Sequence, residues 1–136
     1  MANTIVPFIT LNGKVEEAMN YYVNSFPNSK ITESVSYGDL AQVDSEKKYI
    51  LHGEAEIMGT TMMFMDMVTN PGGAAPAVSW STSFYLDCAT EAEFDAIFAS
   101  LSNGGTVMMG PEAAGDLRKV AWVTDKFGVT WQPVWK

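Results

Sequence analysis

The sequence predicts an α+β fold built from two β-α-β-β-β modules. Three observations lead to this prediction. Two segments have the apolar periodicity of helices, strand-like runs between Gly-containing turns fill most of the remainder, and the elements follow the same order twice. Each predicted helix has one apolar stripe that can pack on one face of its own sheet. The opposite sheet face is left to form a cavity or to meet a second sheet.

The first helix is predicted around residues 15–26, where apolar residues recur at i, i+3, i+4 and i+7. Asn12-Gly13 can cap its start, Glu16 and Glu17 occupy the favourable first turn, and Phe26-Pro27 stops it. The predicted buried stripe consists of Val15, Ala18, Met19, Tyr22, Val23 and Phe26.

The second helix repeats this rhythm in the other half of the chain. Thr90 and Glu93 form a capping box at its start, and Asn103-Gly104-Gly105 ends it. Its predicted stripe consists of Phe94, Ile97, Phe98 and Leu101.

The remaining segments read as strands. "TIVPFITL" precedes the first helix, and "SKITESVSY", "KYILHGEAEI" and "TTMMFMDMV" follow it. "WSTSFYL" precedes the second helix, and "GTVMMG", "LRKVAWVT" and "VTWQPVW" follow it. The Pro- and Gly-rich segment Thr69 to Val78 reads as a linker. We therefore predict one domain, 1–136, with module one at about 1–68, the linker at about 69–78 and module two at about 79–136.

Composition excludes several classes of protein. The formal net charge is −8, and the eight Lys and Arg residues form no patch, so we expect no nucleic-acid partner. No run approaches the roughly 20 apolar residues of a membrane span, so we expect no membrane partner. The first residues lack the features of a signal peptide, which makes a cytoplasmic protein the expectation.

The single cysteine, Cys88, allows neither an intrachain disulfide nor a cysteine-based zinc site. It stands just before the second helix, whose N-terminus could stabilise a thiolate. The simpler interpretation is a small, half-buried residue at the end of a strand.

Strand alternation also groups candidate ligand-binding residues. Alternation places the hydroxyls of Ser81, Ser83 and Tyr85 on one face of "WSTSFYL". The opposite face should pack on the second helix, so the hydroxyls should face the site. In the same way Met63 and Met65 share a face of their strand with Met67, and adaptable thioethers suit an apolar ligand. With Gln132 in the last strand, these residues would form a neutral lining without a strong general base. The alternative is ordinary core packing or a half-buried strand face. The candidate lining is Met63, Met65, Ser81, Ser83, Tyr85 and Gln132.

The only histidine, His52, shares a predicted strand face with Glu54 and Glu56. Imidazole with carboxylates is a metal-binding combination, although residues two apart in a strand lie about 6.5–7 Å apart at the backbone, which strains a shared site. An exposed polar strand face is the simpler interpretation.

Four segments in a fixed order carry a family resemblance: "PFITLNGKVEEAMNYYVNSFPNSKI", "HGEAEIMG", "SFYLDCATEAEFDAIFASLSNGG" and "DKFGVTWQ". Together they resemble the vicinal-oxygen-chelate superfamily, and within it the PhnB-like group. The resemblance implies a glyoxalase/bleomycin resistance-like fold in which the modules form a cupped mixed sheet around the site. It also implies a homodimer, for which four tryptophans, three of them after residue 120, would suit an apolar seam.

Metal-dependent members take ligands from the first and last strands of each module. Carried onto this chain, those positions fall at Pro7 (or Phe8), Met63, Ser81 and Gln132. These side chains offer at best a thioether, a hydroxyl and an amide, whereas catalytic metals prefer imidazole or carboxylate ligands. We therefore expect no metal at the inherited position and no cofactor.

Members of the group often carry a ubiquinone-pathway methyltransferase label. The Gly pairs here, Gly72-Gly73 and Gly104-Gly105, do not stand between a first strand and a helix, so nothing in the sequence supports it. The leading hypothesis is a metal-independent protein that binds an unidentified small molecule. The alternative is an isomerase, lyase or dioxygenase with a displaced metal site using His52, Glu54, Glu56 or Asp66. A purely structural dimerisation module is the third possibility.

Overall fold

The computed structural model describes residues 4–69, 79 and 81–136. The chain separates into two compact units, residues 1–76 and 77–136. The boundary falls in the predicted linker, of which residues 70–78 lie outside the described part. We call the two units module one and module two.

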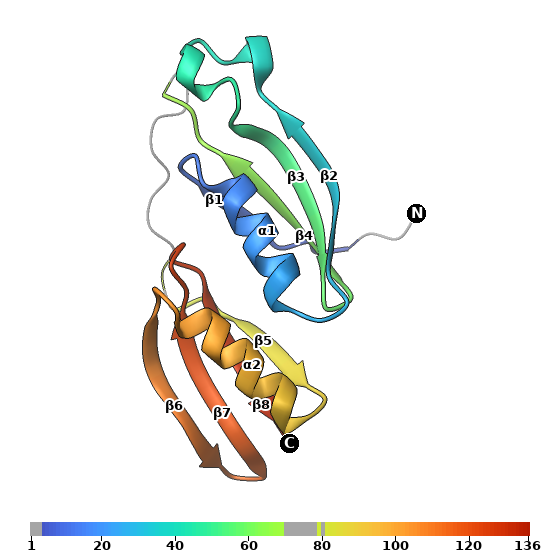
Figure 1. The fold of residues 1–136 in the computed structure, drawn as a ribbon, viewed down its shortest axis with the longest axis vertical. Coiled ribbons are helices and arrows are strands. Elements are labelled where there is room, and N and C mark those ends of the chain that lie inside the picture. Colours follow the sequence, from blue (N-terminus) through green and yellow to red (C-terminus); the bar gives the residue numbers. More distant parts are fainter. Residues whose placement is uncertain (1–3, 70–78, 80) are drawn as a thin grey trace. The chain divides into compact units, whose positions relative to one another are not determined.

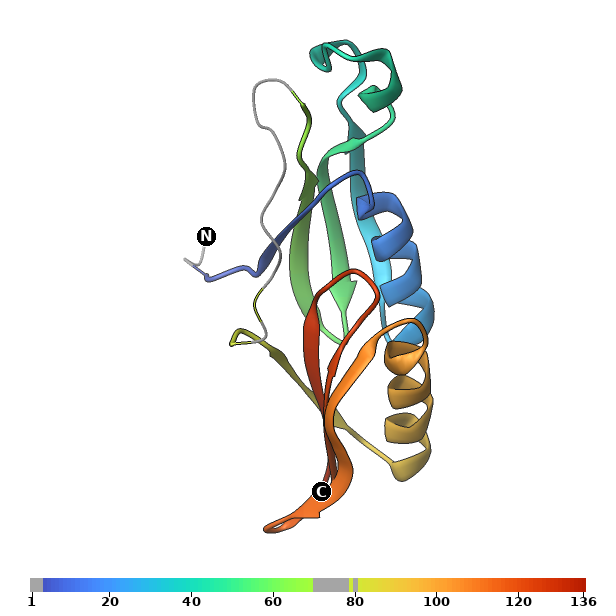
Figure 2. The same ribbon diagram turned by 90° about the vertical axis from the view of Figure 1, so that its left-hand side faces the viewer.

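Module one is a four-stranded mixed sheet with one helix on one face (Figures 1 and 2). The strand order is β1-β4-β3-β2, with β1 parallel to β4 and the other pairs antiparallel. Two short 3-10 turns, Gly38–Leu40 and Asp44–Glu46, lie between β2 and β3 and were not predicted. The elements are β1 (Phe8–Leu11), α1 (Val15–Ser25), β2 (Lys30–Ser36), β3 (Ile50–Ile57) and β4 (Thr60–Asp66).

Module two repeats this plan with strand order β5-β8-β7-β6, and β5 is parallel to β8. The predicted repeat of element order is therefore confirmed. The strand "WSTSFYL" was predicted too long, because β5 begins only at Phe84 and Ser81 lies in the preceding turn. The elements are β5 (Phe84–Cys88), α2 (Glu91–Ser102), β6 (Thr106–Ala114), β7 (Leu117–Thr124) and β8 (Thr130–Trp135).

Each helix buries most of its predicted stripe, whereas Val23 and Phe98 are only partly buried. In α1, Val15, Ala18, Met19 and Tyr22 are buried, and the Tyr22 ring stacks on Phe64 of β4 at 6.1 Å. In α2, Phe94, Ile97 and Leu101 are buried. These contacts fix which sheet face is covered and which remains open. Neither described helix has the length and apolar run that a membrane crossing needs.

The two helices begin differently. The Thr90 cap of α2 is confirmed, since its hydroxyl accepts from the Glu93 amide at 3.1 Å, but the Glu93 carboxylate accepts from the Ala89 amide at 3.1 Å instead of completing the predicted capping box with Thr90. The predicted Asn12-Gly13 cap of α1 is wrong: Lys14 is the N-cap residue and provides no side-chain cap. The Val15 amide instead donates at 3.1 Å to the carboxylate of Asp66, in β4. A buried carboxylate from another strand replaces the local cap.

The tryptophans that the structure describes in module two do not all lie at the surface. Trp131 is 1% exposed and stacks at an angle on Phe84 at 5.3 Å, so it belongs to the module core. Trp135 is partly exposed and lies 4.9 Å from the Arg118 guanidinium. The expectation that all of them suit a dimer seam fails for Trp131, and Trp80 lies outside the described residues.

Candidate functional site

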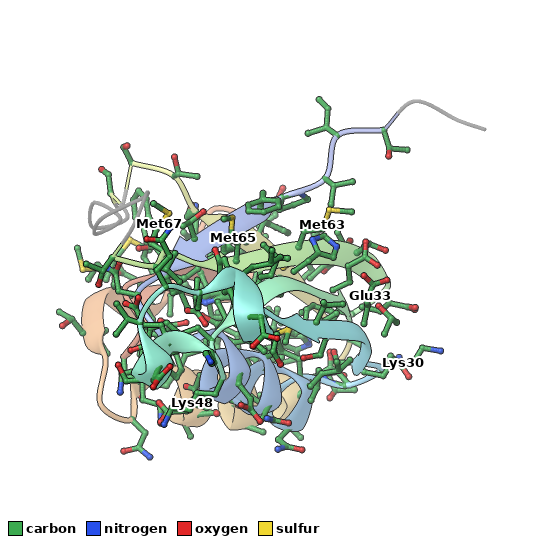
Figure 3. The ribbon with its side chains drawn as sticks, turned by 90° about the horizontal axis from the view of Figure 1, so that it is seen from above. Lys30, Glu33, Lys48, Met63, Met65 and Met67 are labelled. Atoms are coloured by element: carbon green, nitrogen blue, oxygen red, sulfur yellow. The ribbon has the colours of Figure 1, made fainter. Side chains whose placement is uncertain are left out.

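The sheet face opposite α1 carries the predicted methionines. Met63 and Met65 lie on it, and Figure 3 shows Met67 following them on the side of β4 away from α1. Met63 is paired in register with Phe8 of β1 and with Glu54 of β3. We call this surface the open face of module one. It combines thioethers, an exposed phenylalanine and acidic groups.

The methionines of this face are half-buried. Met65 also packs against a small second core of Tyr37, Ala41 and Val68, which lies beyond the ends of β2 and β4. Part of its side chain therefore serves packing. Met63, beside the half-exposed Phe8 ring, is the methionine better placed to meet a ligand.

The open face of module two, opposite α2, is neutral around Gln132. Gln132 is paired in register with Tyr85, whose side chain is 54% exposed. The Gln132 amide nitrogen donates to the Ser83 hydroxyl at 2.7 Å. Three of the predicted lining residues thus lie together. Ser81 does not join them; it sits in the turn before β5, with its hydroxyl 3.0 Å from that of Ser79.

Two buried aspartates have a structural role, although their burial could suggest catalytic acids. Their carboxylates accept hydrogen bonds from backbone amides. Asp66 is 1% exposed, and its second carboxylate oxygen accepts from the Ile50 amide at 3.0 Å. Asp125 is 4% exposed and accepts from the amide of Val129 at 3.1 Å and from the Trp131 indole at 2.9 Å. With both oxygens occupied, Asp66 is poorly suited to the metal-ligand role of the alternative hypothesis.

Cys88 lies at the end of β5, as the simpler interpretation predicted, and is buried there instead of half-buried. Burial raises the pKa of the Cys88 thiol to about 11. The negative charges of Glu93 and Asp87 add to this rise, whereas a backbone hydrogen bond opposes it. A thiol with so high a pKa is protonated at neutral pH and is a poor nucleophile. The nearby helix N-terminus does not activate it.

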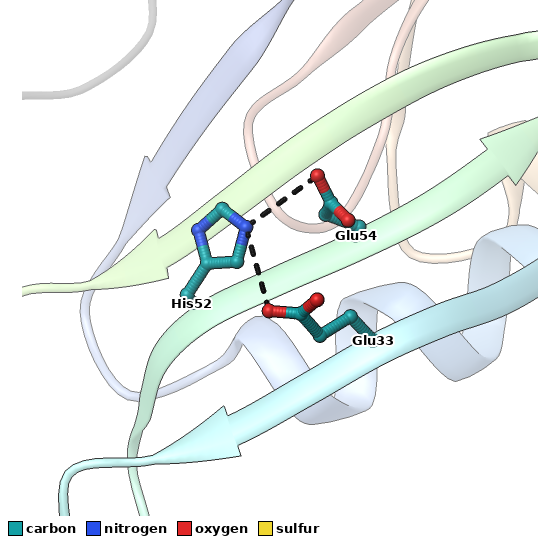
Figure 4. Close-up of side chains that lie close together, drawn as sticks. All are labelled: Glu33, His52 and Glu54. Carbon is teal, nitrogen blue, oxygen red and sulfur yellow. Dashed lines mark ion pairs between the residues drawn. The ribbon is translucent and has the colours of Figure 1, made fainter.

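His52 meets two glutamates on the open face of module one (Figure 4). Its Nε2 lies 3.6 Å from the Glu54 carboxylate and 3.9 Å from that of Glu33, on β2. The sequence grouped His52 with Glu56, but Glu56 stands opposite Lys30 in the β2–β3 register. Glu33 was missed because a register shift between Ile31 and Glu33 sets this pairing, and no pattern within β2 reveals it.

The family model described as 3-demethylubiquinone-9 3-methyltransferase matches residues 3–134. The chain belongs to this PhnB-like family. Its fold is of the glyoxalase/bleomycin resistance-like type, as the sequence segments indicated. No curated protein sequence matches the chain at a significant level.

Solved structures agree with the PhnB-like assignment. A Bacillus cereus PhnB protein with the provisional name 3-demethylubiquinone-9 3-methyltransferase is 28% identical, with a TM-score of 0.87 over 98% of this chain and 100% of that one. Protein PA1353 of Pseudomonas aeruginosa is 24% identical, with a TM-score of 0.85 over 99% and 98%. A glyoxylase/bleomycin resistance protein/dioxygenase domain from Frankia is 8% identical, with a TM-score of 0.63 over 99% and 98%. The last two comparisons show the fold alone.

Strand pairing shows which residues stand beside Met63 and Gln132, the two last-strand positions at which the resemblance to the superfamily places metal ligands. Met63 and Gln132 each stand four residues after a turn glycine, and their partners on the parallel neighbouring strands are Phe8 and Tyr85. Pro7 precedes β1, which begins at Phe8, and Ser81 lies in the turn before β5. A phenyl ring, a thioether, a phenolic hydroxyl and an amide do not match the imidazole and carboxylate ligands that catalytic metals prefer. Neither pair of residues, Phe8 with Met63 in module one or Tyr85 with Gln132 in module two, fits a metal.

The methyltransferase description of the family also finds no support in the site. A Rossmann-type S-adenosylmethionine site needs a Gly-rich turn between a strand and a helix of a parallel sheet. Both sheets here are mixed, and Gly104-Gly105 follows α2 instead of preceding a helix. Gly72-Gly73 lies outside the described residues. In the part of the chain that the structure describes, no residues form such a site.

Proposed function

We propose that this PhnB-like protein binds a small, largely uncharged organic molecule, without a metal at the superfamily's ligand positions, and that it does so as a homodimer. The observation that carries the proposal is the identity of the four register-equivalent residues. Phe8, Met63, Tyr85 and Gln132 are all neutral, and three of them present aromatic or thioether surface.

The polar groups of module two supply orientation in this proposal. The hydrogen bond to Ser83 fixes the Gln132 amide, so its oxygen is held ready to accept from a ligand. The half-exposed Tyr85 beside it adds a hydroxyl at the tip of an apolar ring. An apolar surface with a few oriented polar groups is typical of small-molecule sites.

Native mass spectrometry of the full chain as purified tests the proposal first. We expect a dimer, with an organic molecule retained in part of the population. A ligand identified in this way, or from a small-molecule panel, should raise the melting temperature because it binds only the folded state. A panel that leaves the melting temperature unchanged would refute small-molecule binding.

The residue assignment is tested by Gln132→Leu. Loss of one neutral hydrogen bond should weaken the ligand about tenfold. Gln42→Leu is the matched control, because Gln42 is the only other glutamine in the sequence and is exposed outside both sheets. Equal affinities for the two variants would remove Gln132 from the site.

A second variant tests whether the superfamily's ligand positions in this chain can bind a metal. Gln132→Glu restores a carboxylate at one superfamily position, but Phe8, Met63 and Tyr85 still offer no imidazole. It should therefore bind no divalent metal more tightly than the unaltered chain. A gain of tight binding from this one change would show that the positions are wrongly assigned.

A further inference from the structure

Three potential metal ligands converge on the open face of module one. Glu33 comes from β2, while His52 and Glu54 come from β3. One ligand atom from each lies within 4.8 Å of the other two. Figure 4 shows both carboxylates directed to the same ring nitrogen of His52. Although backbone spacing in one strand argues against a shared ion, the side chains of His52 and Glu54 close that distance.

The two glutamates stand directly opposite each other in the antiparallel register. Like charges at such a cross-strand pair destabilise the sheet. Among the described residues, the ion-pair partner of each is His52, which is charged only when protonated. Lys30, also on β2, is instead opposite Glu56. Neither glutamate therefore pairs with a Lys or Arg among the ion pairs of the described residues.

The distances suit a single divalent ion. Two ligand atoms bound tetrahedrally to one zinc ion, each at about 2.0–2.1 Å, are separated by about 3.4 Å. The observed separations of 3.6 and 3.9 Å from the imidazole nitrogen need only small side-chain rotations to reach this geometry. Exposed fractions of 33% for His52, 24% for Glu54 and 49% for Glu33 leave an entry route and room for a water ligand.

The ligand chemistry selects the class of ion. One imidazole and two carboxylates favour zinc and neighbouring first-row transition metals over Ca²⁺ or Mg²⁺, which prefer oxygen alone. We propose that Glu33, His52 and Glu54 form a zinc-class divalent metal site that joins β2 to β3. The site is distinct from the superfamily's positions and does not depend on ligand binding at Gln132.

Zinc titration of the metal-free full chain, followed by calorimetry and thermal melting, tests the proposal. We expect one Zn²⁺ per module one, bound at micromolar concentration, and a melting temperature that rises with zinc and returns on chelation. His52→Ala should weaken binding at least tenfold. Glu56→Gln is the matched control, because this strand neighbour shares the face but not the cluster, and it should bind zinc as the unaltered chain does.

Glu33→Gln should change the melting temperature in opposite directions, relative to the unaltered chain, without and with zinc. Without zinc, its melting temperature should rise slightly, because the opposed charges are relieved; with zinc, the further rise should be lost. Co²⁺ in place of zinc adds a readout, since the visible absorption of tetrahedral Co²⁺ should appear in the unaltered chain and disappear in His52→Ala.

Absence of saturable zinc binding, or binding that His52→Ala and Glu33→Gln leave unchanged, would overturn the proposal. Gln132→Leu separates it from the proposed function, because this variant should lose ligand affinity while keeping zinc affinity.

Discussion

The two modules share an order of elements and a strand order, but they start their helices by different means. In module two the cap is local: Thr90 serves an amide three residues away. In module one the cap is tertiary: Asp66 serves Val15, 51 residues away in sequence, and also holds Ile50. The same topology therefore rests on a replaceable surface contact in one module and on a buried carboxylate in the other.

Their open faces differ as well. Module one presents thioethers together with a histidine and glutamates, whereas the region around Gln132 in module two is neutral. Backbone positions related by the repeat thus carry different chemistry. The difference shows that equivalence of elements does not predict equivalence of sites, because side chains on an open face are not constrained by the core.

Among these changes, Asp66→Ala should lower the stability most, because it removes the tertiary cap of α1 in module one. It leaves two buried backbone amides, those of Val15 and Ile50, without their acceptor, so the free energy of unfolding should fall by about 3 kcal/mol or more. Urea unfolding followed by circular dichroism measures the loss, and amide exchange in the first turn of α1 localises it. A loss below about 1 kcal/mol would mean that Asp66 is not the cap.

Alkaline pH should weaken module two through Cys88. The folded thiol keeps its proton up to a pKa of about 11, compared with an ordinary value of 9.0. Between these values the unfolded chain releases a proton that the folded chain retains, so stability falls as pH rises, by up to about 2 kcal/mol. Urea unfolding of the unaltered chain and of Cys88→Ala from pH 8 to pH 11 isolates this contribution from lysines and tyrosines. Parallel pH profiles would contradict it.

Thr90→Ala should cost about 1 kcal/mol, as for a typical N-cap. The Thr90 hydroxyl is an exposed acceptor for one amide, which water can replace in part. The same urea assay applies, with tryptophan fluorescence as a second probe, since all four tryptophans belong to module two. A cost as large as that of Asp66→Ala would remove the distinction between local and tertiary caps.

Ser83→Ala should have the smallest effect on folding, about 0.5 kcal/mol, because its hydrogen bond to Gln132 is only partly buried. Its effect on ligand affinity should be larger, since the freed Gln132 amide loses its fixed orientation. Melting temperature and ligand affinity measured on the same variant separate the two roles. A large stability loss without a change in affinity would assign Ser83 to packing.

Much of the fold was readable from local pattern. Most of both helix stripes, the Thr90 cap and the alternation that places Met63, Met65 and His52 on an open face depend on spacing within one element. They were predictable because helix and strand periodicity fixes direction relative to the element's own axis.

Other features depended on which strand lies beside which. The pairing of β1 with β4 and of β5 with β8 placed Phe8 opposite Met63 and Tyr85 opposite Gln132, and the end of β5 left Ser81 outside the strand. The β2–β3 register shift brought Glu33 to His52.

The sequence by itself therefore determined the elements, their repeat and the chemistry each face can offer, because these follow from short-range periodicity. Only the tertiary structure decided the partners: Asp66 as the cap of α1, Glu33 as the third member of the histidine cluster, and Gln132 bonded to Ser83. Such contacts join residues 19 to 51 positions apart. Strand register and folding in three dimensions set them, and no local pattern encodes them.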